Sequence, residues 1–323
     1  MNGEVKLFSG TANLPLATQI AQKVRFGSRT PRSLEPVDVQ RFSDGEIRVE
    51  LLQNVRGCQT FIIQPTCAPT NDNLMEMILM ADALRRSSAG EVVAVIPYYG
   101  YSRQDRRPGY SRVPISARIV ADLIETVGIS HIVTVDIHAT QIQGFFHIPV
   151  DNVSATHLFV ADIFTRWMDE NPIIVSPDVG GVARARALAS HLYDMELAIV
   201  DKRRPKANVA EVMNIVGDVR DKTCIIIDDM VDTAGTLAKG ADALMKVGGA
   251  RRVVAYATHG VLSGKARENL EGSLLHELVV TDTIPLPDHM VGCEKVRQLS
   301  IAGILAETIE RIATGESISE ILE

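Results

Sequence analysis

The sequence is poor in cysteine, in aromatic side chains and in long apolar runs. Among 323 residues there are 4 cysteines and 1 tryptophan, and aromatic residues make up 5%. No two cysteines have CxxC spacing, so neither a zinc site nor a redox motif is predicted. No apolar run approaches the ~20 residues that span a bilayer, and Met1–Lys6 lacks the apolar core of a signal peptide. These absences predict a soluble, cytoplasmic protein that does not enter a membrane.

An excess of positive charge is also missing. The formal net charge is −7 and the sequence pI is about 5.7, which argues against a general nucleic-acid binder because such a protein needs a basic face. Basic residues gather locally at 103–112 and 202–206. Clusters of this kind suit a small anionic ligand, although solvated surface charge is the common alternative.

Short apolar segments alternate with amphipathic ones along the whole chain, which predicts an α/β fold with mainly parallel sheets covered by helices on both faces. In such sheets, ligands collect beyond the carboxyl ends of the strands. The predicted strands are residues 5–8, 60–64, 92–96, 132–135, 173–176, 197–200, 223–227, 253–257 and 278–281. The predicted helices are residues 14–24, 74–87, 115–127, 155–168, 182–192, 237–247 and 300–312.

One segment departs from this alternation. In residues 41–52, Ile47, Val49 and Leu51 alternate with polar residues after a Ser-Asp-Gly turn, which predicts a projecting β-hairpin. The chain is also longer than one core usually supports, and its halves repeat the same order of elements. We therefore expect two similar domains, residues 1–153 and 154–323.

The most informative segment is residues 227–236, Ile-Asp-Asp-Met-Val-Asp-Thr-Ala-Gly-Thr. An apolar strand ends in two adjacent carboxylates, and a small-residue loop then leads into a helix. N–H groups at a helix start form an anion cradle, and Asp228 and Asp229 can accept hydrogen bonds from sugar hydroxyls. The segment predicts a sugar phosphate held at both ends; Asp232 or Thr233 acting only as a helix cap is the alternative.

Four other segments carry polar residues after apolar strands. The loop 97–107 suits a nucleotide, because guanidinium groups bind phosphate and an amide can read a base edge; an exposed loop with paired arginines is equally compatible with its residues. His138 could ligate a metal-bound nucleotide, Asp178 could equally be a helix cap, and the cations of 202–206 could close over phosphates or remain solvated. A P-loop is absent, since the nearest match at 260–266 is one residue short and ends in Ala266.

Taken together and in this order, these segments resemble the ribose-phosphate diphosphokinase family, whose domains have the type I phosphoribosyltransferase fold. The resemblance runs over nearly the whole chain. Its specific parts are residues 41–46, 101–106, 136–146, 201–205 and 228–236.

The resemblance implies transfer of the diphosphate of ATP to the 1-hydroxyl of ribose 5-phosphate, giving phosphoribosyl diphosphate (PRPP) and AMP for nucleotide biosynthesis. It implies Mg²⁺ as cofactor and a homo-oligomer, a hexamer in the family, with no nucleic-acid partner. Lys202 and Arg204 would be catalytic, and His138 and Asp178 would hold the metal. The resemblance assigns ATP to Phe42, Asp44, Gly45, Glu46, Arg103, Gln104 and Asp105. It assigns ribose 5-phosphate to Arg204, Asp228, Asp229, Asp232, Thr233, Ala234, Gly235 and Thr236.

Two competing functions share part of this pattern. A phosphoribosyltransferase would use residues 228–236 but has no need of the ATP segments. A non-enzymatic regulatory paralogue would join oligomers of active subunits, but it has no need of Lys202, Arg204 or His138. The stretch 26–39 looks longer than in the family, and the tail 318–323 is atypical; both concern subunit contacts and regulation more than chemistry.

Overall fold

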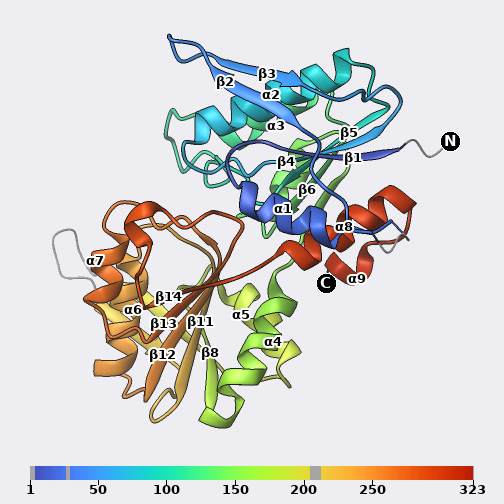
Figure 1. The fold of residues 1–323 in the computed structure, drawn as a ribbon. Helices are drawn as coiled ribbons and strands as arrows, with labels where there is room; N and C mark the ends of the chain where they lie inside the picture. The colour runs from blue at the N-terminus through green and yellow to red at the C-terminus, as the bar shows by residue number, and fades with distance from the viewer. Residues whose placement is uncertain (1–3, 27–29, 204–211, 323) are drawn as a thin grey trace. The chain divides into compact units, whose positions relative to one another are not determined.

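The computed structural model describes residues 4–26, 30–203 and 212–322 (Figure 1). Contacts divide the chain into two compact units. The first unit comprises Met1–Ser154, Thr283–Pro285 and Ser300–Glu323, and the second comprises Ala155–Asp282 and Leu286–Leu299. The sequence pattern had placed residues 300–323 in the second domain, whereas their contacts group them with the first unit; the rest of the predicted division stays a prediction.

The first unit is built on a five-stranded parallel sheet of order β1-β4-β5-β6-β7. Alternate strand residues are buried on both faces, since Phe8 and Ile62 pack in one core cluster while their neighbours Leu7 and Phe61 are equally buried. The strands are β1 (Val5–Ser9), β4 (Gln59–Ile63), β5 (Glu91–Ile96), β6 (His131–Val135) and β7 (Val150–Val153).

Helices cover this sheet, and a separate two-stranded hairpin packs against one of them. The helices are α1 (Leu14–Lys23), α2 (Thr70–Arg86), α3 (Ser116–Thr126), η1 (Thr140–Phe145), α8 (Ala302–Thr314) and α9 (Ser319–Leu322). Helices α1 and α8 pack side by side (Figure 1). The antiparallel hairpin of β2 (Val37–Arg41) and β3 (Ile47–Leu51) packs against α2, which confirms the predicted hairpin.

The second unit contains a seven-stranded sheet of order β10-β9-β8-β11-β12-β13-β14, parallel except for β10 against β9. One core cluster joins strand residues such as Ile226 and Ala255 to Leu237 and Leu244 of α6. The strands are β8 (Pro172–Ser176), β9 (Leu197–Arg203), β10 (Val212–Val216), β11 (Thr223–Val231), β12 (Arg252–Gly260), β13 (Glu277–Thr281) and β14 (Val296–Leu299). The helices are α4 (Thr156–Trp167), η2 (Met168–Glu170), α5 (Val182–His191), α6 (Gly235–Lys246), α7 (Ala266–Glu271) and η3 (Asp288–Met290).

A partly buried polar network ties α4 to this sheet. Arg297 of β14 donates to both oxygens of Asp162 on α4, at 2.9 and 2.7 Å, and the Tyr256 hydroxyl of β12 donates to Asp162 Oδ2 at 2.6 Å. Trp167 Nε1 donates to the same hydroxyl at 2.8 Å. Burial would raise the pKa of Asp162, but the hydrogen bonds from Arg297 and Tyr256 lower it below its ordinary value.

The α/β class with two mainly parallel sheets is therefore confirmed. Within the described ranges, no helix has the length and apolar character needed to cross a membrane.

Candidate active site

Strand β11 carries the acidic pair into the centre of the second sheet. The sequence predicted that the strand would end at Ile227, but it continues to Val231, so Asp228 and Asp229 lie within it. The extension is held by pairing with β12, where Met230 is opposite His259 and Val231 is opposite Gly260. Since β8 pairs with β11 only as far as Ile226, the acidic pair lies just beyond the point where the β8 pairing stops.

The loop after β11 places the start of α6 beside this pair. Ala234 has a left-handed backbone with φ of 58°, and α6 begins at the next residue without a hydrogen bond from a capping side chain. Asn269 Nδ2 donates to the Thr233 carbonyl at 2.8 Å, and the Ser263 N–H donates to the Asp232 carbonyl at 3.0 Å. The loop is thus fixed from outside, while the first N–H groups of α6 remain available to an anion.

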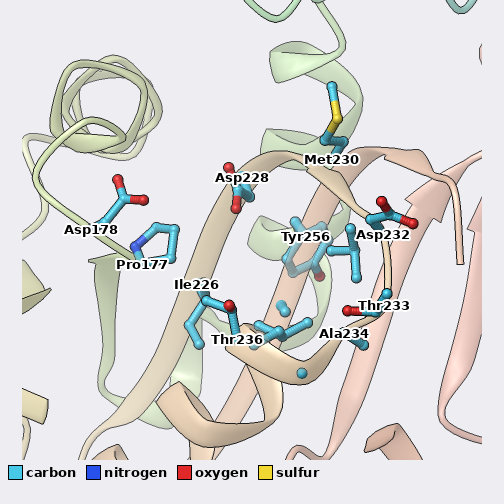
Figure 2. Close-up of a pocket in the computed structure, with 14 residues that line it drawn as sticks. Pro177, Asp178, Ile226, Asp228, Met230, Asp232, Thr233, Ala234, Thr236 and Tyr256 are labelled. Carbon is cyan, nitrogen blue, oxygen red and sulfur yellow. The ribbon is translucent and has the colours of Figure 1, made fainter. Parts of the chain in front are cut away.

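These residues enclose a pocket of about 290 Å³ within the second unit. Figure 2 shows Asp178 and Asp228 on one side of it and Asp232, Thr233 and Ala234 on the other. A helix start on one wall and a carboxylate on another suit a ligand with an anionic end and a hydroxylated end. The lining residues are Pro177, Asp178, Ile226, Asp228, Met230, Val231, Asp232, Thr233, Ala234, Gly235, Thr236, Leu237, Ala255 and Tyr256.

The two members of the acidic pair occupy different environments. The Asp228 side chain is 36% exposed and lines the pocket, whereas the Asp229 side chain is 7% exposed and is not among the lining residues. The pKa of Asp228 is raised to about 7, and the largest cause is desolvation, because the exposed part of the side chain faces a pocket rather than open solvent. The neighbouring Asp229 carboxyl contributes to this rise, and the charge of Arg184 partly offsets both effects.

Arg184, on the first turns of α5, was not predicted. Its Nη1 lies 3.3 Å from Asp228 Oδ1 and 3.3 Å from Asp229 Oδ1. No recognised motif contains this residue, and the sequence offers only its position shortly after Gly180 and Gly181 as a signal. Its partners are 44 and 45 residues away along the chain, and only the pairing of β8 with β11 brings them near.

Asp178 follows β8 in the same pocket. It is exposed, and its Oδ1 accepts the Gly181 N–H at 2.9 Å, which closes the turn into α5. The alternative interpretation, a turn-closing carboxylate, therefore has direct support, but an exposed carboxylate in a pocket rich in oxygen donors also suits magnesium, which keeps several waters and takes few protein ligands.

The predicted nucleotide residues lie in the first unit. Phe42, Asp44, Gly45 and Glu46 are all exposed at the tip of the β2–β3 hairpin, where the Phe42 N–H donates to the Glu46 carbonyl at 2.9 Å. Gly45 has φ of 95°, a conformation that glycine adopts readily. The tip presents a ring and two carboxylates to solvent, which is compatible with a ligand or a partner.

The loop after β5 is partly fixed. Arg103 and Gln104 are exposed, but the Gln104 Oε1 accepts from Ser116 Oγ at 2.6 Å. Asp105 is 8% exposed and accepts from Gln141 Nε2 at 2.6 Å. Its carboxylate therefore has a protein partner already, and a role in shaping the loop fits this burial better than direct contact with a nucleotide.

His138 follows β6 and is exposed, two residues after Asp136, which has a left-handed φ of 37°. It belongs to the first unit, whereas Asp178 belongs to the second, so their pairing as magnesium ligands stays a prediction. In the part of the chain that the structure describes, no group of three or more His, Cys, Asp or Glu side chains could hold a metal ion.

The predicted catalytic residues fall at the edge of the described ranges. Lys202 lies in β9, where the backbone is described but the side chain is not. Arg204 lies outside the described residues.

Comparison with known proteins places this geometry among relatives. Residues 5–128 match the N-terminal domain of ribose phosphate pyrophosphokinase, and residues 188–323 match the phosphoribosyl synthetase-associated domain. Ribose-phosphate pyrophosphokinase of Haemophilus ducreyi is 56% identical over 99% of both chains, and that of Haemophilus influenzae is 56% identical over 98% of both. The crystal structure of phosphoribosylpyrophosphate synthetase from Mycobacterium smegmatis is 41% identical, with a TM-score of 0.88 over 97% of this chain and 99% of that one.

Proposed function

Since the chain belongs to the ribose-phosphate pyrophosphokinase family, whose members make PRPP and AMP from ATP and ribose 5-phosphate, we propose that the second-unit pocket holds ribose 5-phosphate during this transfer. The observation that carries the proposal is the junction of β11 and α6. It presents an uncapped helix start and the Asp228 carboxylate to one cavity. The 5-phosphate would take the helix start, and the ribose hydroxyls would donate to Asp228.

The loop residues complete this assignment. Gly235 and Thr236 begin α6, so their N–H groups and the hydroxyls of Thr233 and Thr236 can donate to phosphate oxygens. Ala234 supplies the left-handed turn, and the Asp232 backbone is anchored by Ser263. Asp229 is buried and supports the sugar site from behind.

ATP would be held by the first-unit residues Phe42, Asp44, Gly45, Glu46, Arg103 and Gln104, with Asp105 shaping the loop that carries Arg103. The supporting observations are the exposure of the hairpin tip and of Arg103. An exposed ring can stack on adenine, and a guanidinium can pair with phosphate oxygens.

Family members generally use Mg²⁺, and Asp178 suits it chemically as an exposed carboxylate in the sugar pocket. We assign Asp178 and His138 as the protein ligands. Bound to phosphate oxygens, the ion would neutralise charge on the diphosphate that is transferred.

Lys202 and Arg204 are proposed to stabilise negative charge on the transferred group and on the departing AMP. Phosphoryl transfer depends mainly on positioning and on charge neutralisation, so two cations suffice without covalent chemistry. We further propose a cytoplasmic homo-oligomer, a hexamer as the family implies.

The test is a coupled assay of AMP release and PRPP formation with purified protein, ATP and Mg²⁺. We expect both products only when ribose 5-phosphate is present. A phosphoribosyltransferase would release no AMP and would instead consume added PRPP with a base, and a regulatory paralogue would do neither.

A Lys202→Ala variant tests the catalytic assignment. Loss of a transition-state charge partner typically lowers turnover by about 10²–10³-fold, while binding of ribose 5-phosphate, measured by calorimetry, should persist. Near-normal turnover in this variant would remove Lys202 from the mechanism.

A further inference from the structure

Arg184 contacts both members of the acidic pair but does not line the sugar pocket. We propose that Arg184 is a positioning residue for ribose 5-phosphate: it orients Asp228 toward the sugar and favours its charged form, and Asp229 anchors Arg184. The inference deepens the proposed function and rests on it, because it concerns how the same sugar site is kept ready for its substrate.

Geometry separates the tasks of the two carboxylates. Asp228 lines the pocket, whereas Asp229, whose side chain is 7% exposed, lies behind it. One guanidinium nitrogen, Arg184 Nη1, is 3.3 Å from an oxygen of each. A carboxylate buried this deeply needs a charged partner, and Arg184 satisfies it while remaining in contact with the carboxylate that faces the substrate.

The Asp228 carboxylate is also fixed in orientation. Its Oδ1 accepts the Asp229 N–H at 2.9 Å and Arg184 Nη1 at 3.3 Å. Both bonds are made to Oδ1, so they fix the orientation of a carboxylate that lines the pocket, where a ribose hydroxyl can donate to it. An acceptor that is already held in place does not have to be ordered when the sugar binds. Less conformational entropy is therefore lost on binding.

Charge gives Arg184 a second effect at the same atom. Two adjacent carboxylates repel each other, and burial penalises their ionised forms. Removal of the guanidinium would leave the pair free to take up a proton, and a protonated Asp228 is a poorer acceptor for a hydroxyl donor. Burial and the Asp229 carboxyl raise the pKa of Asp228, and the charge of Arg184, together with the Asp229 backbone N–H, opposes this rise.

The contribution of Arg184 is therefore specific to the sugar. Loss of Arg184 should weaken the binding of ribose 5-phosphate. The binding of ATP should change little, because the proposed ATP residues lie in the first unit and depend on other side chains. A salt bridge that only supported the fold would instead lower stability and leave both Michaelis constants unchanged.

The experiment compares Arg184→Ala, Arg184→Lys and Arg186→Ala in the full-length enzyme. Arg186 is an exposed arginine on the same helix and outside the pocket, so it is the matched control. We expect Arg184→Ala to raise the KM for ribose 5-phosphate about tenfold or more, the loss of roughly one charged hydrogen bond, with the KM for ATP changed less than about twofold. Arg184→Lys should recover part of the loss.

A double-mutant cycle then asks whether Arg184 acts through Asp228. In an Asp228→Asn background, Arg184→Ala should change the KM for ribose 5-phosphate by less than about threefold, since the two residues act as one unit. Multiplying effects in the double variant would overturn the inference, as would an Arg184→Ala enzyme with normal KM values. If circular dichroism shows that Arg184→Ala is unfolded, the cycle is run with Arg184→Lys and is read in the same way.

An assay of the wild-type enzyme distinguishes a failure of the proposed function from a failure of the role proposed for Arg184. If it forms no PRPP, the proposed function itself fails. If it forms PRPP and the Arg184 variants bind ribose 5-phosphate normally, only the role of Arg184 fails.

Discussion

Asp228 lowers the stability of the folded protein while it keeps the proposed sugar site ready to bind. A carboxyl group whose pKa is raised in the folded protein costs stability wherever the unfolded chain would ionise it freely. Burial and Asp229 raise the pKa of Asp228 to about 7. At neutral pH this residue therefore works against folding, which is a common property of binding sites kept ready for a ligand.

We predict that Asp228→Asn stabilises the protein in a pH-dependent way. Wild-type stability falls between the unfolded pKa near ~3.9 and the folded value of about 7, because the native state holds the proton more tightly over this range. An asparagine at this position cannot ionise, so the variant does not undergo this decrease in stability. The melting temperature of the variant should exceed that of the wild type at pH 8, and the gap should narrow at pH 5.

The control for this prediction is Asp169→Asn, which changes an exposed carboxylate in the same unit. It should change the melting temperature little. An Asp228→Asn variant less stable than the wild type at pH 8 would contradict the assigned cost.

Asp162 is the opposite case, a carboxylate whose partners favour its charge. Its bidentate bond to Arg297 and its bond from Tyr256 hold its pKa below the ordinary value despite burial. Asp162 therefore stabilises the fold at pH values above the pKa that it has in the unfolded chain. This stabilisation is lost as the pH falls through the lower pKa that it has in the folded protein.

Asp162→Asn should lower the free energy of unfolding by about 1–3 kcal/mol at pH 7, because it leaves Arg297 without a charged partner on α4. Urea unfolding at pH 7 and below pH 4 measures this, and the difference should shrink at the lower pH. The comparison variant is Asp82→Asn, whose exposed surface pair with Arg86 should contribute much less to stability than the Asp162 network.

At the scale of elements, helix α6 begins in the constrained binding loop, whereas the middle of the helix has room for a larger side chain. Gly240 lies within the helix, and apart from its chain neighbours and the adjacent helix backbone no atom lies within 4 Å of the position that a Cβ would take. Glycine in a helix interior costs roughly 0.5–1 kcal/mol relative to alanine. We predict that Gly240→Ala raises the free energy of unfolding by about this amount, measured by urea unfolding with activity unchanged.

Gly10, in the turn between β1 and α1, is the matched contrast. A Cβ there would lie 2.4 Å from Gln64 Cδ and 2.4 Å from Glu76 Oε1, both on buried side chains. Gly10→Ala should therefore destabilise the protein by about 1–3 kcal/mol. If the two alanine variants behaved alike, local space would not be what distinguishes these glycines.

The strands also show how much of the fold could be predicted from the sequence alone. Continuous apolar runs predicted most strands, because a parallel strand is buried on both faces. The end of β11 was missed because Asp228 and Asp229 look like a strand terminus, whereas pairing with β12 carries the strand to Val231. Strands β7 and β14 were missed because each has four residues and only two apolar side chains. Strand β10 was missed although four of its five residues are apolar, because it directly follows the charged stretch after β9.

The site was predicted to a similar degree. The carboxylate and the helix start are neighbours in sequence, so Asp228 and Thr236 could be recognised as one motif, and the structure brings both to one pocket. Arg184 could not be recognised, because its contact with Asp228 depends on tertiary packing across two strands. The burial of Asp105 and Asp229 is likewise a tertiary property that residue type does not reveal.

For the whole molecule, two units with separate cores imply that ligands can stabilise them separately. A ligand that binds only the native state stabilises it by about 2.7 kcal/mol at a concentration of 100 times Kd. We predict that ribose 5-phosphate raises the melting temperature of the transition to which the second unit belongs. Differential scanning calorimetry tests this, and Asp228→Asn should reduce the shift, whereas Asp169→Asn should leave it intact.

The chain returns to its first unit at the end. Helix α8 buries Leu305 and Ile309 in that unit and packs against α1, which buries Leu16 and Ile20. On the ribosome, α1 is therefore made long before its neighbour, while the strands between Ala155 and Asp282 emerge as one continuous stretch. The nascent second unit can collapse while the first still exposes an apolar surface, so translation speed and chaperone access should matter most for the half that is synthesised first.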